Sequence, residues 1–433
     1  MPKIAYIGAG SGAFARQVIT DILAVDGLDD GEFALVDVDA SRLEPAHELM
    51  CKLVARSGKD WKVTSTTDRT EILDGADFVV NSIEVAGLRN VRHDYDIPLR
   101  YGVDQCIGDT IGPGGIFKAL RTGPAWLEIC EDVARLAPNA MVLNYTNPMS
   151  ILTLAALRHT DLEVVGLCHS VQGTSWQLSQ YLGVEWRDLV FECAGINHNA
   201  WFTKLTHHGE DVYPRLHQRA NDPEIYERDP VRFEVMKHLG YFVTESSGHF
   251  SEYVPYFRKR PELLERYIKG GYLGESGFYA NNWPRWRADQ DNDVADWTSG
   301  RKELPSGRSA EYASTIIQAR TLNKARVIYG NVRNSGLIDN LPDGCVEVAC
   351  LVDGRGIQPT HFGPLPEQMA ALNRSHMAVH ELMVQALLER DRAKAKYALM
   401  LDPLTAAVCS LDEISRMFDE MFQAQRQDLT AFD

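Results

Sequence analysis

The stretch IAYIGAGSGA, residues 4–13, decides the fold. Four apolar residues precede the pattern GxGxxA, and a helical pattern follows, which is the order of strand, tight turn and helix in a dinucleotide-binding unit. The first glycine permits the tight turn, the second lets the backbone approach a pyrophosphate, and the start of the helix faces the phosphates. We therefore predict that Gly8, Gly10 and Ser11 bind a dinucleotide.

The end of the next apolar run supports this prediction. Residues 33–36 are apolar and lead into Asp37, which is placed to accept a hydrogen bond from a ribose hydroxyl. Because a carboxylate there repels a 2′-phosphate, the predicted cofactor is NAD rather than NADP. Asn81 ends a further predicted strand, where ligands gather in such sheets, and we assign it to the cofactor site; a plain turn residue is the alternative.

Short apolar runs and helical patterns alternate along the first half of the chain, which is typical of a parallel sheet built from βαβ units. The predicted strands are residues 4–7, 33–36, 63–65, 78–81, 141–144 and 164–168, and the predicted helices are residues 14–24, 41–57, 124–136, 149–158 and 172–182. We predict an α/β fold that begins with a Rossmann-type, doubly wound parallel sheet, the NAD-binding domain, over residues 1–185.

The pattern changes after about residue 183. Residues 190–194 and 201–205 predict antiparallel strands, and residues 311–319 and 369–390 predict helices. Residues 213–304 are rich in Pro, Gly, Tyr and Trp and predict a long, loop-rich stretch, in which WPRWR (residues 283–287) fits an interface or a substrate loop. We predict a second, α+β domain for substrate binding and oligomer contacts over residues 186–433, with a site between the two domains.

Composition excludes several classes of protein. The 433 residues are too many for one compact core, and the net charge of −16 argues against nucleic acid and anionic membranes as partners. No stretch has the length and apolarity of a membrane span, and the N-terminal strand leaves no room for a signal peptide. Because the eight cysteines are scattered and form no CxxC pair, we expect a cytoplasmic protein with reduced thiols.

Two further motifs carry chemistry. Asn147 precedes a proline after the fifth predicted strand, which resembles lactate and malate dehydrogenases, where the matching asparagine touches substrate; a strand-ending turn is the alternative.

Cys168 ends the sixth predicted strand, and His198 lies in GINHN, residues 195–199. A thiolate and an imidazole from two adjacent segments are able to share one divalent ion, with positions left open for substrate hydroxyls and water. The alternatives are a buried structural cysteine and a histidine that acts as the general base of a dehydrogenase.

Taken together, the motifs resemble glycoside hydrolase family 4 along nearly the whole chain. The matching blocks are CHSV (168–171), GINH (195–198), DTIGPGG (109–115), NPM (147–149), YFVTESS (241–247), SEYVP (251–255) and NVRN (331–334). The CHSV form is typical of the α-galactosidase branch of the family. The resemblance implies an enzyme that hydrolyses α-galactosides such as melibiose with NAD and a divalent metal, usually manganese, in place of the two carboxylates of most glycosidases. It also implies a second domain of the lactate/malate dehydrogenase type.

The resemblance implies a reaction course and residue roles as well. NAD takes a hydride from C3 of the sugar, the resulting ketone acidifies the C2 proton, a base removes that proton, the aglycone leaves, water adds, and the hydride returns. By position, Cys168 and His198 bind the metal, Asn147 binds a sugar hydroxyl, and Tyr253 is the base. His169 stands where some members of the family carry an aspartate, and it either donates a proton to the leaving group or orients the sugar.

Substrate choice within the family is indicated by Glu84. Branches that act on 6-phosphorylated sugars need cationic residues near C6, and an acid at this position repels phosphate, so we predict an unphosphorylated sugar. The alternatives are an α-glucuronidase or α-galacturonidase of the same family, an NAD-dependent 2-hydroxyacid dehydrogenase, and a non-catalytic NAD-sensing protein. The resemblance also implies a homodimer or homotetramer.

Overall fold

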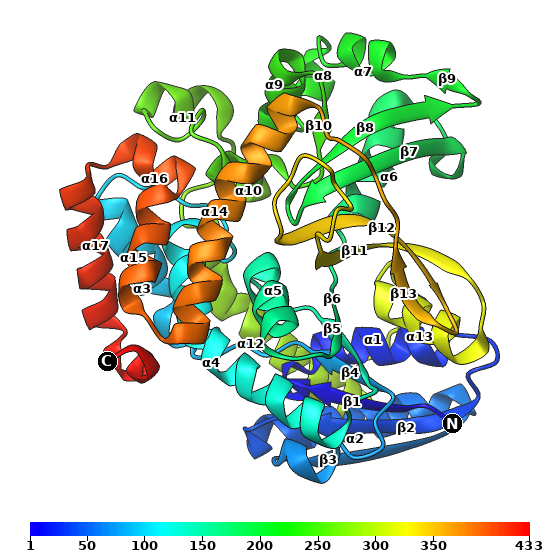
Figure 1. The fold of residues 1–433 in the computed structure, drawn as a ribbon. Coiled ribbons are helices and arrows are strands. Elements are labelled where there is room, and N and C mark those ends of the chain that lie inside the picture. Colours follow the sequence, from blue (N-terminus) through cyan, green and yellow to red (C-terminus); the bar gives the residue numbers. More distant parts are fainter.

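A computed structural model describes residues 1–433, in which a single mixed sheet runs through the molecule (Figure 1). The strands are β1 (Lys3–Ile7), β2 (Asp30–Val36), β3 (Asp60–Thr66), β4 (Phe78–Asn81), β5 (Met141–Asn144), β6 (Glu163–Gly166), β7 (Leu189–Ile196), β8 (Asn199–His207), β9 (Glu210–Asp211), β10 (Phe242–Val243), β11 (Arg326–Arg333), β12 (Cys345–Asp353) and β13 (Gly356–Pro359). Their order is β10-β8-β7-β12-β11-β6-β5-β4-β1-β2-β3, with β13 added to β12 and β9 to β8.

Helices cover this sheet on both sides. They are α1 (Ala13–Leu23), α2 (Ala40–Ser57), α3 (Gly87–Arg100), α4 (Gly112–Leu136), α5 (Met149–His159), α6 (Ser170–Leu182), α7 (Tyr213–Arg219), α8 (Pro223–Tyr226), α9 (Pro230–Leu239), α10 (Ser247–Tyr253), α11 (Pro261–Tyr267), α12 (Phe278–Ser299), α13 (Tyr312–Leu322), α14 (Glu367–Glu389), α15 (Arg392–Leu401), α16 (Pro403–Val408) and α17 (Leu411–Ala424). Short 3-10 helices lie at Ala9–Ser11, Arg69–Glu71, Trp186–Asp188, Gly271–Leu273, Arg426–Asp428 and Thr430–Phe432.

The first six strands confirm the predicted Rossmann sheet. They pair in parallel in the order β3-β2-β1-β4-β5-β6, which is the doubly wound order of dinucleotide-binding folds. Successive residues point to opposite faces, so Ala5 and Ile7 enter one apolar core while Ile4 and Tyr6 enter another. Helices cover both cores, which explains why these strands are apolar along their whole length.

The sheet continues without a break into an antiparallel part. β11 pairs with β6 at a single register position, Asn331 opposite Gly166, and β11 and β12 pair along their length. The predicted pair at residues 190–194 and 201–205 is confirmed as β7 and β8, which are antiparallel. The sequence did not predict β11, β12, α3 or the three C-terminal helices α15–α17. The division of the chain at residues 185 and 186 stays a prediction.

The prediction of a loop-rich stretch over residues 213–304 is wrong. This stretch contains α7 to α12, of which α12 has 22 residues. The prolines that read as helix breakers stand at the first turns of α7, α8, α9 and α11, where the missing N–H costs no hydrogen bond. The predicted helix at 124–136 is likewise too short, because Pro124 lies inside α4, which begins at Gly112.

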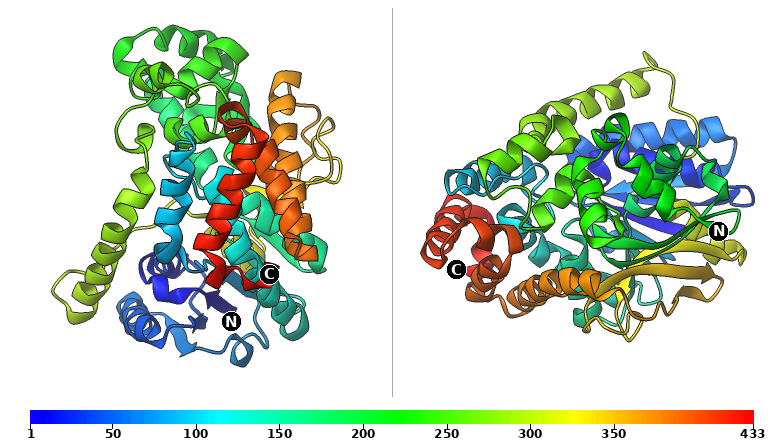
Figure 2. Two further views of the ribbon diagram at one scale, coloured as in Figure 1. Left: turned by 90° about the vertical axis from the view of Figure 1, so that its left-hand side faces the viewer. Right: turned by 90° about the horizontal axis from the view of Figure 1, so that it is seen from above.

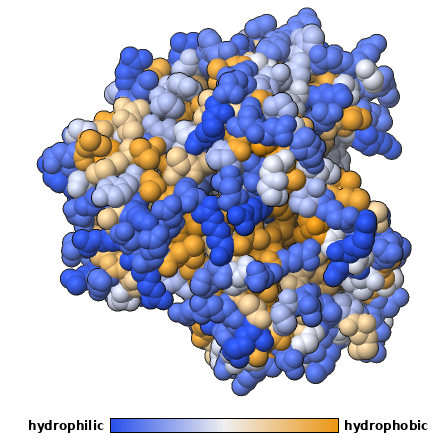
Figure 3. Space-filling model, viewed as in Figure 1, coloured by the Kyte–Doolittle hydropathy of each residue, from blue (hydrophilic) through white to orange (hydrophobic).

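Further views place the long helix α12 at the edge of the molecule. In both panels of Figure 2 it runs along the blue N-terminal elements, and it packs against α2, α3 and α1. Figure 3 shows one face of the molecule as largely polar, with apolar side chains gathered in a hollow near its centre. None of the helices combines the length and the apolar character that a membrane span requires.

Candidate active site

The glycine turn after β1 is shaped by close contacts on both sides. Gly8 has φ +89°, and a Cβ added there would lie 2.7 Å from the carbonyl oxygen of Ser82. Gly10 donates its backbone N–H to Asp37 Oδ2 at 2.8 Å, and a Cβ on Gly10 would lie 2.6 Å from the same oxygen. Glycine is therefore required at both positions by the protein itself, before any ligand is considered.

This turn leaves polar groups free for a ligand. The hydroxyl of Ser11 is buried and has no hydrogen-bond partner in the protein, at the point where the chain turns into α1. Asp37 Oδ1 accepts a hydrogen bond from the N–H of Asp39 at 3.0 Å, so the carboxylate is held at the end of β2 by two backbone donors. An unpaired hydroxyl at the start of a helix and a fixed carboxylate suit the phosphates and a ribose of a dinucleotide.

Asn81 ends β4 as predicted, but its side chain is bonded within the protein. It is fully buried, and its side-chain amide donates to Asn144 Oδ1 at 2.9 Å and to Thr146 Oγ1 at 3.1 Å. These bonds tie the ends of β4 and β5 together behind the site. Any contact of Asn81 with a cofactor must go through its one free oxygen, since Oδ1 has no partner.

Cys168 and His198 come together as predicted. Cys168 follows β6, and its Sγ lies 3.3 Å from His198 Nε2. His198 is in the two-residue turn between β7 and β8 and has φ +62°, a left-handed conformation that non-glycine residues adopt at a cost of about 1 kcal/mol or more. The strained turn aims the imidazole at the thiol.

Two further ligand-type side chains, which the sequence did not single out, complete this cluster. Glu245 Oε2 lies 3.4 Å from His198 Nε2, and Glu245 Oε1 lies 3.9 Å from His249 Nδ1. His198, Glu245 and His249 present ligand atoms within 4.8 Å of one another. No sequence pattern marks the new pair, because Glu245 precedes the short helix α10 and His249 lies in the first turn of that helix.

The charges of the cluster depend on one another. Burial raises the pKa of the Cys168 thiol, so without a cation it stays protonated. Burial also acts on Glu245, but the imidazoles of His198 and His249 outweigh it and lower the pKa of that carboxyl. A divalent cation between them would reverse the effect on the thiol, because a bound metal favours the thiolate. The donor set of thiol, imidazole and carboxylate suits a borderline metal ion with open positions.

Tyr253 lies directly behind this cluster. Its hydroxyl is 3.2 Å from His198 Nδ1, and its side chain is only 1% exposed. Burial, and then the carboxylates of Glu245 and Asp109, raise the pKa of Tyr253 well above its usual value. The tyrosine is therefore in contact with a predicted metal ligand, but it does not line the cavity in front of that ligand.

His169 stands at the rim of the site. Its side chain is exposed, and its Nδ1 lies 3.4 Å from Glu311 Oε1. The carboxylate of Glu311, which faces the ring, raises the pKa of His169 to about 9. A protonated imidazole therefore faces the mouth of the cavity.

Asn147 marks the other wall. Its amide donates to Asp109 Oδ2 at 3.2 Å, and Asp109 lies 3.5 Å from Lys118 Nζ. Lys118 also pairs with Glu84 at 2.9 Å. Burial alone would raise the pKa of Asp109, but Lys118 and His249 lower it to about 2. The sequence block that contains Asp109 was noted without a role for that residue, and Lys118 was missed because a single lysine in an apolar helix gives no pattern.

One cavity of about 690 Å³ lies between these groups. It reaches from Ser11, at the nucleotide turn, to the cluster of Cys168, His198 and Glu245, with Asn147 between them. The single lysine or arginine that lines it is Lys118, whose charge is already paired with two carboxylates. The cavity thus combines the glycine turn, here called the nucleotide end, the cluster of thiol, imidazole and carboxylate, here called the metal end, and a polar wall without an unpaired lysine or arginine.

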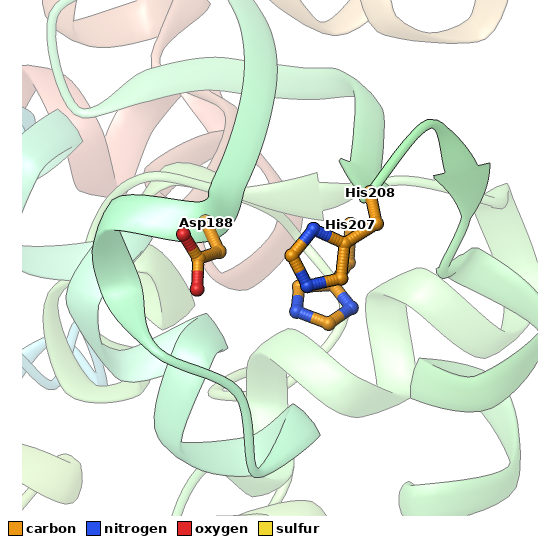
Figure 4. A group of neighbouring side chains, drawn as sticks. All are labelled: Asp188, His207 and His208. Carbon is orange, nitrogen blue, oxygen red and sulfur yellow. The ribbon is translucent and has the colours of Figure 1, made fainter.

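A second group of metal-type side chains lies elsewhere. Asp188, His207 and His208 gather at the far end of the β7–β8 hairpin, and Figure 4 shows the carboxylate facing the two imidazole rings, which are tilted against each other. The three side chains are half-buried or exposed, and none of them lines the cavity. The cluster around His198 is therefore the candidate metal centre.

The chain matches one family over most of its length. Residues 3–184 match the family described as "Family 4 glycosyl hydrolase", and residues 193–405 match the "Family 4 glycosyl hydrolase C-terminal domain".

Several curated proteins are similar to this chain. An alpha-galactosidase of Bacillus subtilis (strain 168) is 41% identical over 431 residues, which are 98% of each chain. An alpha-galactosidase of Rhizobium meliloti (strain 1021) is 38% identical over 98% of this chain and 88% of its own. An alpha-galacturonidase of Lachnoclostridium phytofermentans is 29% identical over 98% of this chain and 96% of its own.

Solved structures share the fold. A putative glucosidase, lplD, of Bacillus subtilis superimposes with a TM-score of 0.88 at 27% identity, over 97% of this chain and 99% of its own. A 6-phospho-alpha-glucosidase from gut microorganisms, in complex with NAD and Mn²⁺, has a TM-score of 0.82 at 22% identity, over 99% and 98%. A malate dehydrogenase of Plasmodium falciparum with NADH has a TM-score of 0.52 at 14% identity, over 90% and 99%.

Proposed function

The chain belongs to family 4 of the glycosyl hydrolases, and from this premise we propose that it hydrolyses α-galactosides with NAD and a divalent metal ion. Membership of a hydrolase family removes the alternatives of a 2-hydroxyacid dehydrogenase and of a non-catalytic NAD sensor. The observation that favours an uncharged sugar is the charge of the cavity wall, and the choice of galactose rests on the similarity to two alpha-galactosidases. The one lysine of the wall is paired with Glu84 and Asp109, and His169 at the rim faces Glu311, so the wall offers no unpaired cationic side chain to a carboxylate or phosphate group of the substrate.

The similarity to two α-galactosidases supports a neutral sugar as well. A uronic acid or a 6-phosphosugar would bring an anion into a cavity that already holds Glu84, Asp109 and Glu245. Taking an anion into such a site without a matching cation is unfavourable, because both desolvation and repulsion oppose it. We therefore rank the α-galacturonidase alternative second, although a relative with that name is 29% identical.

We assign the metal to Cys168 and His198, with Glu245 as a third donor. These atoms converge within 3.4 Å of the imidazole Nε2, and the unusual backbone of His198 fixes the ring in place. His249 completes the wall beside Glu245. A structure of a protein with the same fold, a 6-phospho-alpha-glucosidase, carries NAD and Mn²⁺, which makes manganese the first ion to test.

We assign NAD to the nucleotide end, where Ser11 offers a buried hydroxyl without a partner and Asp37 a fixed carboxylate. When bound, the two cofactors supply a reversible oxidation at C3 of the sugar and a Lewis acid for the neighbouring oxygens. In the cavity between them, Asn147 and Asp109 are placed to hold hydroxyls of the sugar, since each keeps a hydrogen-bonding atom on the wall.

Tyr253 remains the proposed base for the C2 proton. His198 Nδ1 lies 3.2 Å from the tyrosyl oxygen, and if the other ring nitrogen held the metal, Nδ1 would carry the ring proton, donate it in a hydrogen bond to that oxygen and favour the tyrosinate. Access to C2 must pass beside His198, because Tyr253 lies behind that ring. His169, protonated at the rim beside Glu311, is the proposed donor to the leaving group.

One experiment tests the proposed function. The protein is incubated with p-nitrophenyl α-galactoside, the β-galactoside and the α-galacturonide, with and without NAD, Mn²⁺ and a reductant. We expect nitrophenol only from the α-galactoside, and only when both cofactors are present. Accumulation of NADH without release of nitrophenol would contradict a hydrolase that returns the hydride.

We further propose that the enzyme works in the cytoplasm as a homodimer or homotetramer. The scattered cysteines, which form no CxxC pair in the sequence, support the location. Light scattering on the purified protein is expected to give two or four times the mass of one chain, and the mass of one chain would contradict the assembly.

A further inference from the structure

Helix α12 lies across the edge of the sheet at which the nucleotide turn is found. Val294 packs on the turn so closely that a Cβ on Gly12 would lie 2.8 Å from its Cγ2. Asp291, one turn earlier, forms an ion pair of 2.6 Å with Arg42, and Arg42 Nε donates to the carbonyl oxygen of Gly10 at 3.1 Å. The helix therefore contacts the glycine turn directly, although more than 240 residues separate them in the sequence.

The other end of α12 is anchored on the next strand end. Trp283 packs against Gly87, which begins α3, and its ring faces Lys118, with Nζ 6.0 Å from the ring centre. Trp283 and Asp291 are eight residues apart and lie on the same face of the helix. The helix thus bridges the ends of β4 and β1, the two strands between which a dinucleotide crosses such a sheet.

Arg287 lies midway between these two anchors, four residues from each, and is therefore on the same face of the helix. Its Nε is 3.9 Å from Asp291 Oδ1, a carboxylate that also pairs with Arg42 at 2.6 Å, and its guanidinium donates no hydrogen bond within the protein. Burial, and then the neighbouring Arg42, lower the pKa of Arg287, and the carboxylates of Asp291, Asp37 and Glu84 oppose the shift. The five N–H donors of this planar group therefore have no hydrogen-bond acceptor of their own in the protein.

We propose that Arg287 binds the pyrophosphate of the NAD cofactor, and that α12 is the helix that covers the dinucleotide groove. The carboxylates of Asp37, Glu84 and Asp291 all act on Arg287, and of these Arg42 pairs with Asp291 and Lys118 with Glu84. A pyrophosphate among these carboxylates requires a further cation, and the guanidinium matches its oxygens in charge and geometry. This inference rests on the NAD-binding part of the proposed function and is independent of the sugar.

Binding of NAD, ADP-ribose and adenosine to the whole protein, measured by calorimetry without glycoside, tests the inference. Arg287→Ala is expected to weaken NAD and ADP-ribose by about ten- to hundredfold, the loss of a charge-assisted hydrogen bond, and to leave adenosine within about twofold. Arg287→Gln, which keeps most of the aliphatic stem, is expected to weaken NAD and ADP-ribose binding to the same extent. Arg285→Ala is the matched control, because Arg285 is exposed on the same helix and bonds only to Asn282 of that helix.

Three results would overturn the inference. Unchanged NAD affinity in both variants of Arg287 would mean that the side chain does not touch the pyrophosphate. Tighter binding would mean that α12 competes with the cofactor instead of covering it. If adenosine binding weakened as much as NAD binding, the substitution would act on a part of the site other than the pyrophosphate. Failure of the unmodified protein to bind NAD at all is a separate result, which would contradict the proposed function itself.

Discussion

At the nucleotide end of the cavity, the proposed site is built around the glycine turn after β1, where a side chain on Gly8 or Gly10 would collide with Ser82 or Asp37. At the metal end, the binding groups are side chains, and Cys168, His198 and Glu245 come from three separate segments. The nucleotide end therefore depends on the absence of a Cβ at two positions, whereas the metal end depends on the presence of three side chains. The two ends should therefore fail independently and through different kinds of substitution.

The largest effect is expected from Cys168→Ser. Loss of the thiolate removes a metal ligand and with it several kcal/mol of charge stabilisation, so kcat/KM for the α-galactoside should fall about 10³-fold or more. NAD affinity should stay within about twofold, because no part of the nucleotide turn changes. Removal of the metal by EDTA should reproduce the loss in the unmodified protein.

Cys51→Ser is the control for this substitution, since Cys51 is exposed and far from the cavity wall. Full activity of Cys168→Ser, or an equal loss of NAD binding, would show that the two ends are not separate.

Tyr253→Phe tests the link between the metal end and the C2 proton. Removal of a general base costs typically 10²–10⁴-fold in kcat, and we expect a loss in that range together with loss of exchange of the C2 proton with solvent. If Tyr253 only holds His198, the main change is weaker Mn²⁺ binding, and excess metal restores the rate. Tyr256→Phe is the control, because Tyr256 is largely exposed three residues further on.

The difference between the two ends also explains which residues of the site could be predicted from the sequence. The glycine turn is built from neighbours in the chain, so an apolar run, spaced glycines and a terminal Asp37 predict both the Rossmann-type sheet and the cofactor. Cys168 stands out at the end of a predicted strand and His198 in the segment GINHN, and the resemblance to the family assigns both to the metal. Glu245 and His249 lie beside a two-residue strand and a short helix, where no periodic pattern exists. The sequence assigns no role to Lys118 or Arg287, because their partners are distant in the chain. Lys118 pairs with Glu84, and Arg287 is related to the glycine turn.

Gly10→Ala attacks the nucleotide end by adding a single methyl group. That Cβ would lie 2.6 Å from Asp37 Oδ2, so the N–H bond from Gly10 to Asp37 must lengthen and the turn must shift. We expect NAD to bind about ten- to hundredfold more weakly, while Mn²⁺ binding is unchanged. Gly270→Ala is the control, because nothing lies within 4 Å of a Cβ there. Loss of Mn²⁺ binding in Gly10→Ala would mean that the two ends are coupled through the sheet.

The smallest effect is expected between the two ends, at Glu84. Glu84→Gln removes one of the two carboxylates that pair with Lys118, so part of that positive charge becomes available to a substrate anion. The ratio of kcat/KM for p-nitrophenyl α-galacturonide to that for the α-galactoside should rise about fivefold, which corresponds to ~1 kcal/mol. Glu303→Gln, at an exposed site outside the cavity, should leave the ratio unchanged. An unaltered ratio in Glu84→Gln would show that the pairing of Lys118 does not select the neutral sugar, and the choice would then rest on the hydroxyl contacts of Asn147 and Asp109.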